Sequence, residues 1–336
     1  MKAIRLLSVG LAVGMLACTS EETPTEPSGS ASLARSAVAR YTAVDLGTLG
    51  GNRTFASAIN SAGQVVGGST LPSGETRAFL WANGVMTDLG TLGGDYSQGL
   101  GINDRGQVVG ASETAAGENH AFRWEKGVMT DLGTVGERSS GALDINDRGQ
   151  AVGGADGVPI LWDKNVIVSL PLPVGGTYCG VQEINAAGRA IGQCTVNDFA
   201  RAVLWDRDGA SDLGTLGGDL ATATGINASG AVVGISWLSF NNGVHPFLWE
   251  RGTMTDLSTQ GAPTGFIPNA INARGQVAGS YGGGDQIHAV VWERGTTIDL
   301  TIPGTDSYVW DINASGQVVG NTVVGNDSHA VLWTRK

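Results

Sequence analysis

Histidine is the side chain most suited to proton transfer or metal binding near neutral pH, and this chain of 336 residues has four, His120, His245, His288 and His329. All four stand at the same position of an internal repeat, at the start of its third expected strand, where two other copies have Arg77 and Arg201. Equivalent positions of repeats that surround an axis lie far apart, so these side chains should not meet at one metal. We interpret the position as structural, with metal ligation or catalysis as the alternative.

A carboxylate recurs in the same way near the end of the fourth expected strand. It is found at Asp45, Asp88, Asp131, Asp212, Asp256 and Asp299, and Ser169 replaces it in the remaining copy. General acid–base catalysis needs a close pair of groups in different environments, whereas a repeated aspartate is typical of a loop in which the side chain accepts backbone N–H bonds. The sequence has no G-x-S-x-G, HExxH, CxxC or phosphate-loop motif. We therefore predict no catalytic residue, no metal and no cofactor.

Two cysteines flank the turn 185–188 at equal distances along the chain, Cys179 before it and Cys194 after it. In an antiparallel hairpin closed by that turn, the two side chains would face each other within disulfide range. An exported protein also meets an oxidising compartment. We predict a Cys179–Cys194 disulfide. A one-residue bulge would instead offset the two positions and leave buried free thiols.

These residues belong to a unit that occurs seven times. An Asn-x-x-Gly turn begins at Asn60, Asn103, Asn146, Asn185, Asn227, Asn272 and Asn313, and a Trp ends the third segment at Trp81, Trp124, Trp162, Trp205, Trp249, Trp292 and Trp333. The asparagines are 39 to 45 residues apart. A repeat of about 40–45 residues with four short strands is the period of a β-propeller blade.

Each unit predicts four strands. The first ends in Ile-Asn, and the Gly of the following turn suits the positive φ of a hairpin built on a type I turn. The third strand is apolar at consecutive positions, which is typical of a strand buried on both faces. We expect the Gly of the second strand, such as Gly110, to leave room for a neighbouring Trp. We also expect Trp310, within the first strand of the last unit, to lie in the core.

The two ends of the chain are complementary. The seventh copy stops after its third strand, and a sequence of the fourth-strand type stands at the other end, in residues 41–47. An open array would need polar capping repeats, whereas pairing 41–47 with 329–334 closes a ring. We predict an all-β fold in which residues 41–336 form a seven-bladed β-propeller of four-stranded blades, closed by the N-terminal strand completing the last blade.

The motifs DLGTLGG, IN-x-x-GQVVG and His120-Ala121-Phe122 together resemble the bacterial extracellular HAF repeat over residues 41–336. The third unit departs from this pattern, with Val158-Pro159-Ile160 in place of His-Ala-Phe. The resemblance implies an exported repeat protein and no defined activity.

Residues 1–17 have the pattern of a signal peptide, with two basic residues before an apolar run too short to cross a bilayer. The segment ending at Cys18 resembles the lipobox of bacterial lipoproteins, except that Leu16 stands where a smaller residue is usual. We predict that Cys18 is the lipidated first residue of an outer-membrane or cell-surface lipoprotein; an ordinary signal peptide and a periplasmic or secreted protein are the alternatives. Residues 18–40, rich in Ser, Thr, Pro and Glu, predict a disordered tether.

A localised function should lie where the repeats differ. The turns between strands one and two, and between three and four, are short and uniform and share one face of the ring, whereas the connections on the opposite face vary. Loops of that kind commonly carry binding residues. The candidates are Asn52, Arg53, Asp95, Tyr96, Arg138, Tyr178, Asp219, Trp237, Phe240, Tyr281, Asp306 and Tyr308. The alternative is that these side chains pack the bases of the loops.

The formal net charge of −11 argues against nucleic acid as a partner. A rigid ring with variable loops favours a non-catalytic binding module for an unidentified protein, peptide or glycan. We expect a monomer whose membrane contact is the Cys18 lipid alone. One alternative is a structural scaffold of the bacterial envelope. Another is an enzyme, a glycan lyase or hydrolase that would use Asp95 or Asp219 at the channel mouth.

Overall fold

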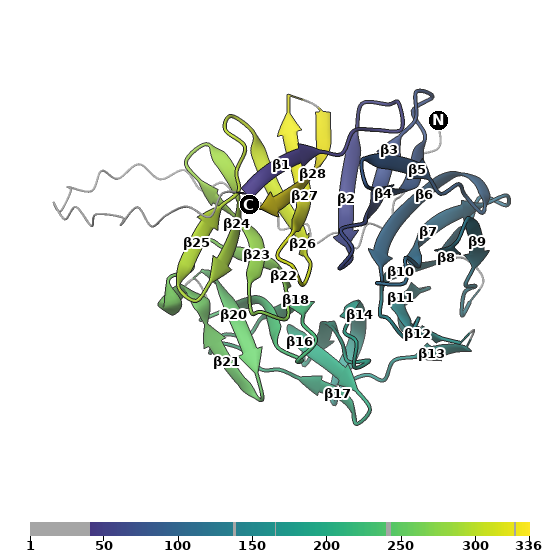
Figure 1. Cartoon of the computed structure of the whole chain (residues 1–336). Helices are drawn as coiled ribbons and strands as arrows, with labels where there is room; N and C mark the ends of the chain where they lie inside the picture. Colours follow the sequence, from purple (N-terminus) through teal and green to yellow (C-terminus); the bar gives the residue numbers. More distant parts are fainter. Residues whose placement is uncertain (1–40, 137–138, 165, 240–242, 326) are drawn as a thin grey trace. The chain divides into compact units, whose positions relative to one another are not determined.

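The structure, a computed structural model, describes residues 41–136, 139–164, 166–239, 243–325 and 327–336. These residues form seven four-stranded antiparallel sheets and one 3-10 helix, η1 (Leu257–Gln260). The sheets are arranged as blades around a central axis, as predicted (Figure 1). No helix within the described residues is long and apolar enough to cross a membrane.

We number the blades 1 to 7 and call the strand positions a to d, from the innermost to the outermost strand. Blade 1 consists of β2 (Thr54–Ile59), β3 (Val65–Thr70), β4 (Thr76–Ala82) and β5 (Val85–Asp88), and blade 2 of β6 (Gly93–Ile102), β7 (Val108–Thr114), β8 (Asn119–Glu125) and β9 (Val128–Asp131). Blade 3 consists of β10 (Ser140–Ile145), β11 (Ala151–Ala155), β12 (Val158–Asp163) and β13 (Val166–Ser169), and blade 4 of β14 (Gly176–Ile184), β15 (Ala190–Val196), β16 (Phe199–Asp206) and β17 (Gly209–Asp212). Blade 5 consists of β18 (Ala221–Ile226), β19 (Val232–Trp237), β20 (Val244–Glu250) and β21 (Thr253–Asp256), and blade 6 of β22 (Ile267–Ile271), β23 (Val277–Gly283), β24 (Gln286–Glu293) and β25 (Thr296–Asp299). Blade 7 consists of β26 (Asp306–Ile312), β27 (Val318–Val324), β28 (Asp327–Arg335) and β1 (Tyr41–Asp45).

Blade 7 is completed by the first strand of the chain. β1 pairs antiparallel with β28, in a register that places Tyr41 opposite Arg335 and Asp45 opposite Val331. The Leu46 N–H extends the ladder by donating to the Ala330 carbonyl over 3.0 Å. Circular closure is therefore confirmed. Because strand d runs from the a–b and c–d turns toward the d–a and b–c loops, Tyr41 lies on the face of the ring that carries the turns.

The a–b turns have the predicted hairpin geometry. In blade 2, the Gly106 N–H donates to the Asn103 carbonyl over 3.0 Å, and Gly106 has a φ of 73°. The Asn103 Oδ1 accepts the N–H groups of Arg105 and Gln107, over 3.1 and 3.0 Å. The side chain thus holds the turn from inside, as an asparagine at the first turn position commonly does.

The other end of each asparagine side chain links neighbouring blades. Its Nδ2 donates to the backbone carbonyl of the corresponding asparagine in the next blade, with separations of 3.0 to 3.2 Å. The seven bonds run 60→103→146→185→227→272→313→60 and so form a closed circle, which we call the asparagine ring. All seven side chains are buried. The prediction that they form turns was correct but incomplete.

Every strand a contains a register shift at its centre, such as the one between Ala142 and Asp144 of β10. Such a bulge turns the strand-a carbonyl toward the Gly that recurs in strand b of every blade. A Cβ built on Gly153 would overlap the Gly141 carbonyl oxygen. The glycines at this position in the other six blades meet the equivalent strand-a carbonyl, and no Trp atom is among their nearest neighbours. The prediction that they make room for a Trp was wrong, because it is the bulged backbone that approaches.

The disulfide Cys179–Cys194 is present and joins strands a and b of blade 4 at directly opposed positions. The prediction was correct because two offsets cancel. The turn closes with the Asn185 N–H donating to the Arg189 carbonyl, one residue further along than the symmetric pairing. The bulge at Gln182 then shifts the register back by one.

We predict that replacing Asn103 by Asp weakens the asparagine ring while leaving the turn intact. The carboxylate can still accept the two N–H bonds inside the turn, but it cannot donate to the Asn146 carbonyl, which keeps only the Gly149 N–H, or to Gln107 Oε1, which would then face a buried carboxylate oxygen. We expect a loss of about 1–3 kcal/mol in the free energy of unfolding, measured by urea denaturation. A loss no larger than that of Ser61→Ala, an exposed residue of the preceding a–b turn, would contradict a structural role for the ring.

Two adjacent glycines of β11 test the close approach of strands a and b. Gly153→Ala should lower the free energy of unfolding by about 1–3 kcal/mol, because the new methyl group must displace the strand-a backbone. Gly154→Ala is the control, since a Cβ there would meet only the Val158 carbonyl oxygen, at 3.7 Å. Equal thermal shifts for the two variants would show that the overlap is unimportant.

Candidate functional site

Each histidine pairs with the aspartate that ends strand d of its own blade. The separations between His Nδ1 and Asp Oδ2 are 2.7 Å for His120–Asp131, 2.8 Å for His245–Asp256, 3.3 Å for His288–Asp299 and 3.0 Å for His329–Asp45. In blade 4, Arg201 takes the place of the histidine, with its Nε 3.1 Å from Asp212 Oδ2. The pairs are therefore separate copies of one contact in separate blades.

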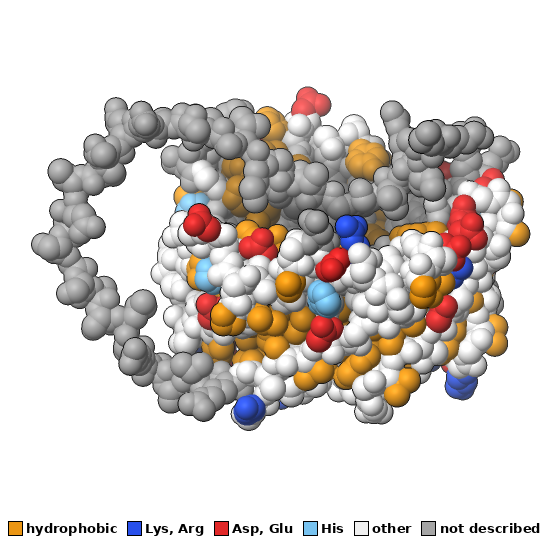
Figure 2. Space-filling view, turned by 90° about the horizontal axis from the view of Figure 1, so that it is seen from above, with side chains coloured by type: hydrophobic (Ala, Val, Ile, Leu, Met, Phe, Trp, Pro, Cys, Tyr) orange, Lys and Arg blue, Asp and Glu red, His pale blue; other side chains and the backbone are white. Residues whose placement is uncertain are grey.

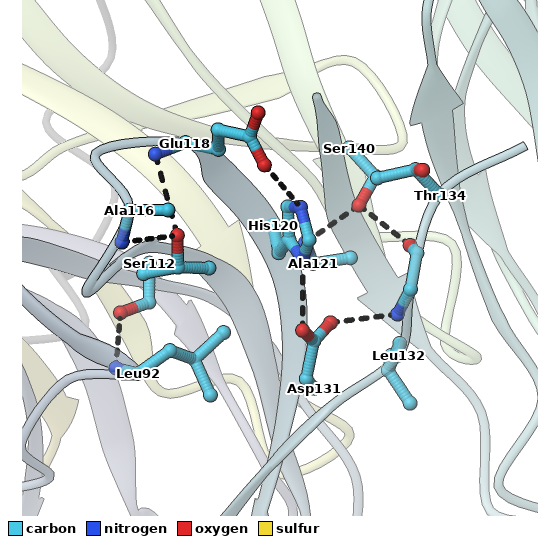
Figure 3. A network of polar contacts seen from close by, with 12 residues as sticks. Leu92, Ser112, Ala116, Glu118, His120, Ala121, Asp131, Leu132, Thr134 and Ser140 are labelled. Atoms are coloured by element: carbon cyan, nitrogen blue, oxygen red, sulfur yellow. Dashed lines mark hydrogen bonds and ion pairs between the residues drawn. The ribbon is translucent and has the colours of Figure 1, made fainter. Parts of the chain in front are cut away.

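Figure 3 shows how such a pair is built into the loop beyond it. The Asp131 Oδ1 accepts the Gly133 N–H over 2.7 Å, and Ser140 of the next blade donates to the Gly133 carbonyl, also over 2.7 Å. The same oxygen of all six strand-d aspartates accepts the N–H two residues further on. The predicted backbone bonds of these aspartates are confirmed. In the part of the chain that the structure describes, no group of three His, Cys, Asp or Glu side chains could hold a metal.

The binding residues expected from sequence lie on the loop face, which we define as the d–a and b–c loops and the strand ends beside them. Arg138 and Phe240 lie outside the described residues. The other ten are distributed over six blades and do not converge on one site. Some are held by neighbours: the Asn52 amide donates to Asp327 over 3.0 Å, and the Asp306 carboxylate accepts the Ile287 N–H over 2.8 Å.

Two predicted aromatic residues stack on neighbouring rings. Tyr281 lies against His288 with ring centroids 4.9 Å apart, and Tyr308 lies against Trp310 at 6.4 Å. Trp310 is 45% exposed, and its Nε1 donates to Asn321 Oδ1 over 2.7 Å. Its predicted place in the core was wrong, because Trp310 is the bulged residue of β26 and is displaced from the inward-facing set.

Exposed apolar side chains gather where blades 3 and 4 meet on the loop face. We call Val158, Leu172, Val174, Tyr178 and Phe199 the blade 3–4 patch. Val174 is 97% exposed and Tyr178 61%. The elements that carry them are in contact: a Cβ on Gly157 would lie 4.0 Å from the Tyr178 ring, and the Asn197 N–H donates to the Gly175 carbonyl over 3.3 Å.

The same patch is where the repeat breaks down. The d–a loop leading into blade 4 reads SLPLPVGGTY, whereas four other loops have a DLGTLGG-type segment and the remaining two still begin Asp-Leu; Ser169 replaces the strand-d aspartate here alone. The disulfide lies directly beside Tyr178 in β14. Only Tyr178 of the five was predicted from sequence, although the change in loop composition marked the region.

The loop face is strongly acidic. Its described cations are Arg53, Arg77 and Arg201, against Asp45, Glu75, Asp88, Asp95, Glu113, Glu118, Asp131, Asp156, Asp198, Asp212, Asp219, Asp256, Asp285, Asp299, Asp306 and Asp327. Figure 2 views the rim of the ring from above rather than the loop face, and red carboxylates outnumber blue side chains on that side as well. The blade 3–4 patch is therefore an apolar area within an anionic surface.

Three carboxylates on the innermost strands were not among the predicted site residues. Asp144, Glu183 and Asp311 each precede an Ile-Asn pair, a position occupied in the other blades by Ala or Gly. Each accepts the Ile N–H of the next blade, over 2.8 to 2.9 Å. Both aspartates also use their second oxygen for the N–H of the residue that follows them. The signal was a change from small to acidic residues at one repeat position.

Burial raises the pKa of Asp144 from 3.8 to about 6, although its two backbone N–H bonds act in the opposite direction. Burial, followed by repulsion from Asp144 and Asp311, raises the pKa of Glu183 well above its usual value, and burial also raises the pKa of Asp311. Raised pKa values often mark acid catalysts. Here, however, both carboxylate oxygens of each aspartate accept backbone N–H groups of the innermost strands, one of them from the next blade. This arrangement favours a role as links between blades.

A pocket of ≈ 160 Å³ lies around the central axis on the face away from the loop face, among the a–b turns of blades 1 to 4 and 7. Its polar lining includes Asp104 and Asp147. Asp104 accepts the Ser61 N–H over 2.7 Å, and Asp147 accepts the Asp104 N–H over 2.9 Å. None of the binding residues predicted from sequence lines this pocket.

No protein-family model matches this sequence, and no curated protein matches it. Similar solved structures are β-propellers. The propeller domain of the Trilobed protease from Pyrococcus furiosus has a TM-score of 0.59 at 8% identity, over 84% of this chain and 94% of that chain. That domain has an open velcro topology, whereas here β1 closes the ring.

Two further structures show the range of proteins that share this fold. YCF48, solved bound to D1 peptide, has a TM-score of 0.55 at 8% identity, over 88% of this chain and 97% of that one. A puromycin-hydrolyzing peptidase of Mycobacterium tuberculosis has a TM-score of 0.53 at 14% identity, over 89% of this chain and 54% of that one. At these identities the likeness shows the fold alone.

The raised pKa of Asp144 predicts that its contribution to stability falls as the pH rises. A carboxyl group with a higher pKa in the folded state binds more protons there than in the unfolded chain. The free energy of unfolding should therefore decrease from about pH 4 to about pH 7 through this group. Asp144→Asn should flatten the pH dependence seen in urea denaturation, and the exposed Asp208→Asn should not. A steeper dependence in Asp144→Asn would contradict the direction of the shift.

Proposed function

We propose that this protein is an exported binding module that captures a protein or peptide through the blade 3–4 patch of its loop face. The observation that carries the proposal is the cluster of exposed apolar side chains at the point where the repeat changes. Exposed apolar groups gathered on a soluble domain commonly mark an interaction surface. Aromatic residues among them are the usual anchors of binding energy.

The patch stands on a rigid support, which favours binding with little loss of conformational entropy. The disulfide ties the strand that carries Tyr178 to its neighbour. The Trp205 indole N–H also donates to the Pro171 carbonyl over 2.7 Å and holds the d–a loop on the blade below it. A partner would thus meet apolar side chains whose backbone is already in place.

The charge around the patch indicates the chemistry of the partner. An anionic surface attracts a cationic ligand, speeds its association and disfavours acidic competitors. We therefore propose a partner segment that combines large apolar side chains with Lys or Arg. The peptide-bound state of YCF48, a structure of similar fold, is consistent with peptide capture by a propeller of this kind.

An exported location is part of the same proposal. A disulfide suits an oxidising compartment, and the expected signal peptide and lipidated Cys18 would keep the module on the envelope. Residues 1–40 lie outside the described residues, so attachment through Cys18 stays a prediction.

The test is selection of peptides from a random library on the full-length protein. We expect enrichment of peptides that combine apolar residues with Lys or Arg, and weaker binding at high salt. Tyr178→Ser together with Val174→Ser should weaken the selected peptides at least about tenfold. The control is Val324→Ser, which removes a side chain that is 56% exposed on the loop face of blade 7.

Thermal unfolding should show that all variants are folded. Equal binding by the patch variant and the control would rule out the patch as the site. Selection of acidic peptides would contradict the electrostatic part of the proposal.

A further inference from the structure

The face opposite the loop face has the reverse charge balance. We call the a–b and c–d turns, with the strand ends beside them, the turn face. Its cations are Arg105, Lys126, Arg148, Lys164, Arg189, Arg207, Arg251, Arg274, Arg294, Arg335 and Lys336, and its acids are Asp104, Glu125, Asp147, Asp163, Asp206, Asp208, Glu250 and Glu293. In a chain with a net charge of −11, the positive charge is thus concentrated at one end of the ring.

Three of these cations form an arc over blades 2 to 5. Each guanidinium extends over the turn glycine of the next blade, Arg105 toward Gly149, Arg148 toward Gly188 and Arg189 toward Gly230. Among the described residues, none of the three arginines forms an ion pair. Their charge is therefore available to an external partner.

Several acids of the turn face are occupied by neighbouring amides instead. Glu125 accepts the Gln107 side-chain amide over 2.9 Å, and Glu293 accepts that of Gln276 over 3.1 Å. Asp163 accepts the Gln150 amide over 3.0 Å. These bonds hold the carboxylates against the ends of strands b and c.

The outer rim of the same sector is apolar. Val85, Val128 and Val166 follow the c–d turns of blades 1, 2 and 3, and they are 65%, 63% and 57% exposed. Lys126 and Lys164 stand in the turns directly before two of them. Exposed apolar side chains alternating with cations are typical of surfaces that lie on a lipid headgroup layer.

The chain also enters the propeller on this face. Tyr41 begins strand d of blade 7, opposite Arg335, and its hydroxyl donates to the carbonyl of Gly316 in the a–b turn over 3.1 Å. Any anchor preceding residue 41 is therefore joined to the molecule at the turn face, the same face that carries the cations.

We propose that the turn face docks on an anionic phospholipid surface through the sector of blades 1 to 4. The arginines and lysines contact headgroup phosphates, and the three valines enter the headgroup layer. Cations spread over one end of a ring suit a planar charged surface, whereas an anionic polymer is usually bound along a continuous basic groove. Docking this way turns the acidic loop face and its patch away from the membrane. The proposal does not depend on which partner the loop face binds.

The experiment uses the full-length protein with vesicles of phosphatidylcholine alone or with phosphatidylglycerol at a ratio of seven to three. One form carries a fluorophore on Ser229→Cys, in an a–b turn, and another on Ser73→Cys, in a b–c loop, both with Cys18→Ser so that the label is attached to the only free thiol. Lipids with a nitroxide on the headgroup report which face is near the membrane. We expect quenching of the turn-face label on the mixed vesicles at low salt, little quenching of the loop-face label, and loss of the difference at high salt.

The substitutions Arg105→Gln, Arg148→Gln and Arg189→Gln together should reduce the quenching of the turn-face label at least about tenfold. The charge-matched control replaces Arg53, Arg77 and Arg201 of the loop face by Gln and should leave it unchanged. Equal quenching of both labels, or equal quenching on the two kinds of vesicle, would overturn the proposal. So would a turn face that bound heparin but not the mixed vesicles, since that result would make it a polyanion site.

Discussion

The structure depends on the asparagine ring, seven buried side chains that each hold a turn with one end and the next blade with the other. The ring has no first or last member, so every donor and every carbonyl in it is paired. A break at any point removes a buried bond between two blades and leaves the carbonyl of the next asparagine with only the N–H of its own turn glycine. The a–b turns must therefore keep the same length and geometry in all blades, and variation between blades is confined to the other end of the strands.

This constraint gives the two faces different freedoms. The turn face can change charge but not shape, because Asn and Gly are required at fixed positions while the two residues between them are exposed. There the chain places arginines such as Arg105 and Arg148. The loop face can change both. Its strand-d aspartates begin six of the d–a loops with the same backbone bond. Blade 3, which has Ser169 in place of the aspartate, is the one whose loop has become apolar.

Much of the fold could be predicted from the sequence, because a sevenfold repeat with matching end segments permits few arrangements. The strand-d aspartates were also interpreted correctly, since one position repeated in six blades must meet the same local backbone. The two wrong predictions about the fold, the buried Trp310 and the role of the strand-b glycines, share one cause. The strand-a bulge cannot be recognised from the repeat pattern, yet it exposes Trp310 and brings a carbonyl onto the strand-b glycine. The disulfide was found only because the bulge offset the extra residue of the turn.

The candidate site was predicted less well than the fold. Aromatic and charged residues on loops were selected by type, but Asn52 and Asp306 proved to be tied to neighbouring loops. Val174 and Leu172 of the patch were overlooked, because valine and leucine in a sequence usually indicate core. The channel carboxylates were overlooked because one acidic residue before Ile-Asn looks like ordinary variation until the blades are superposed.

The pairing of β1 with β28 also decides how the molecule responds to mechanical tension. A pull on the segment before Tyr41 acts at the turn-face end of β1 and along the strand, because strand d runs from one face of the ring to the other. The hydrogen bonds to β28 lie across that direction, so all of them resist the pull together in shear. Unzipping, in which they would yield one after another, requires a sideways force. A propeller held by its N-terminus is thus fastened through the stronger of the two modes.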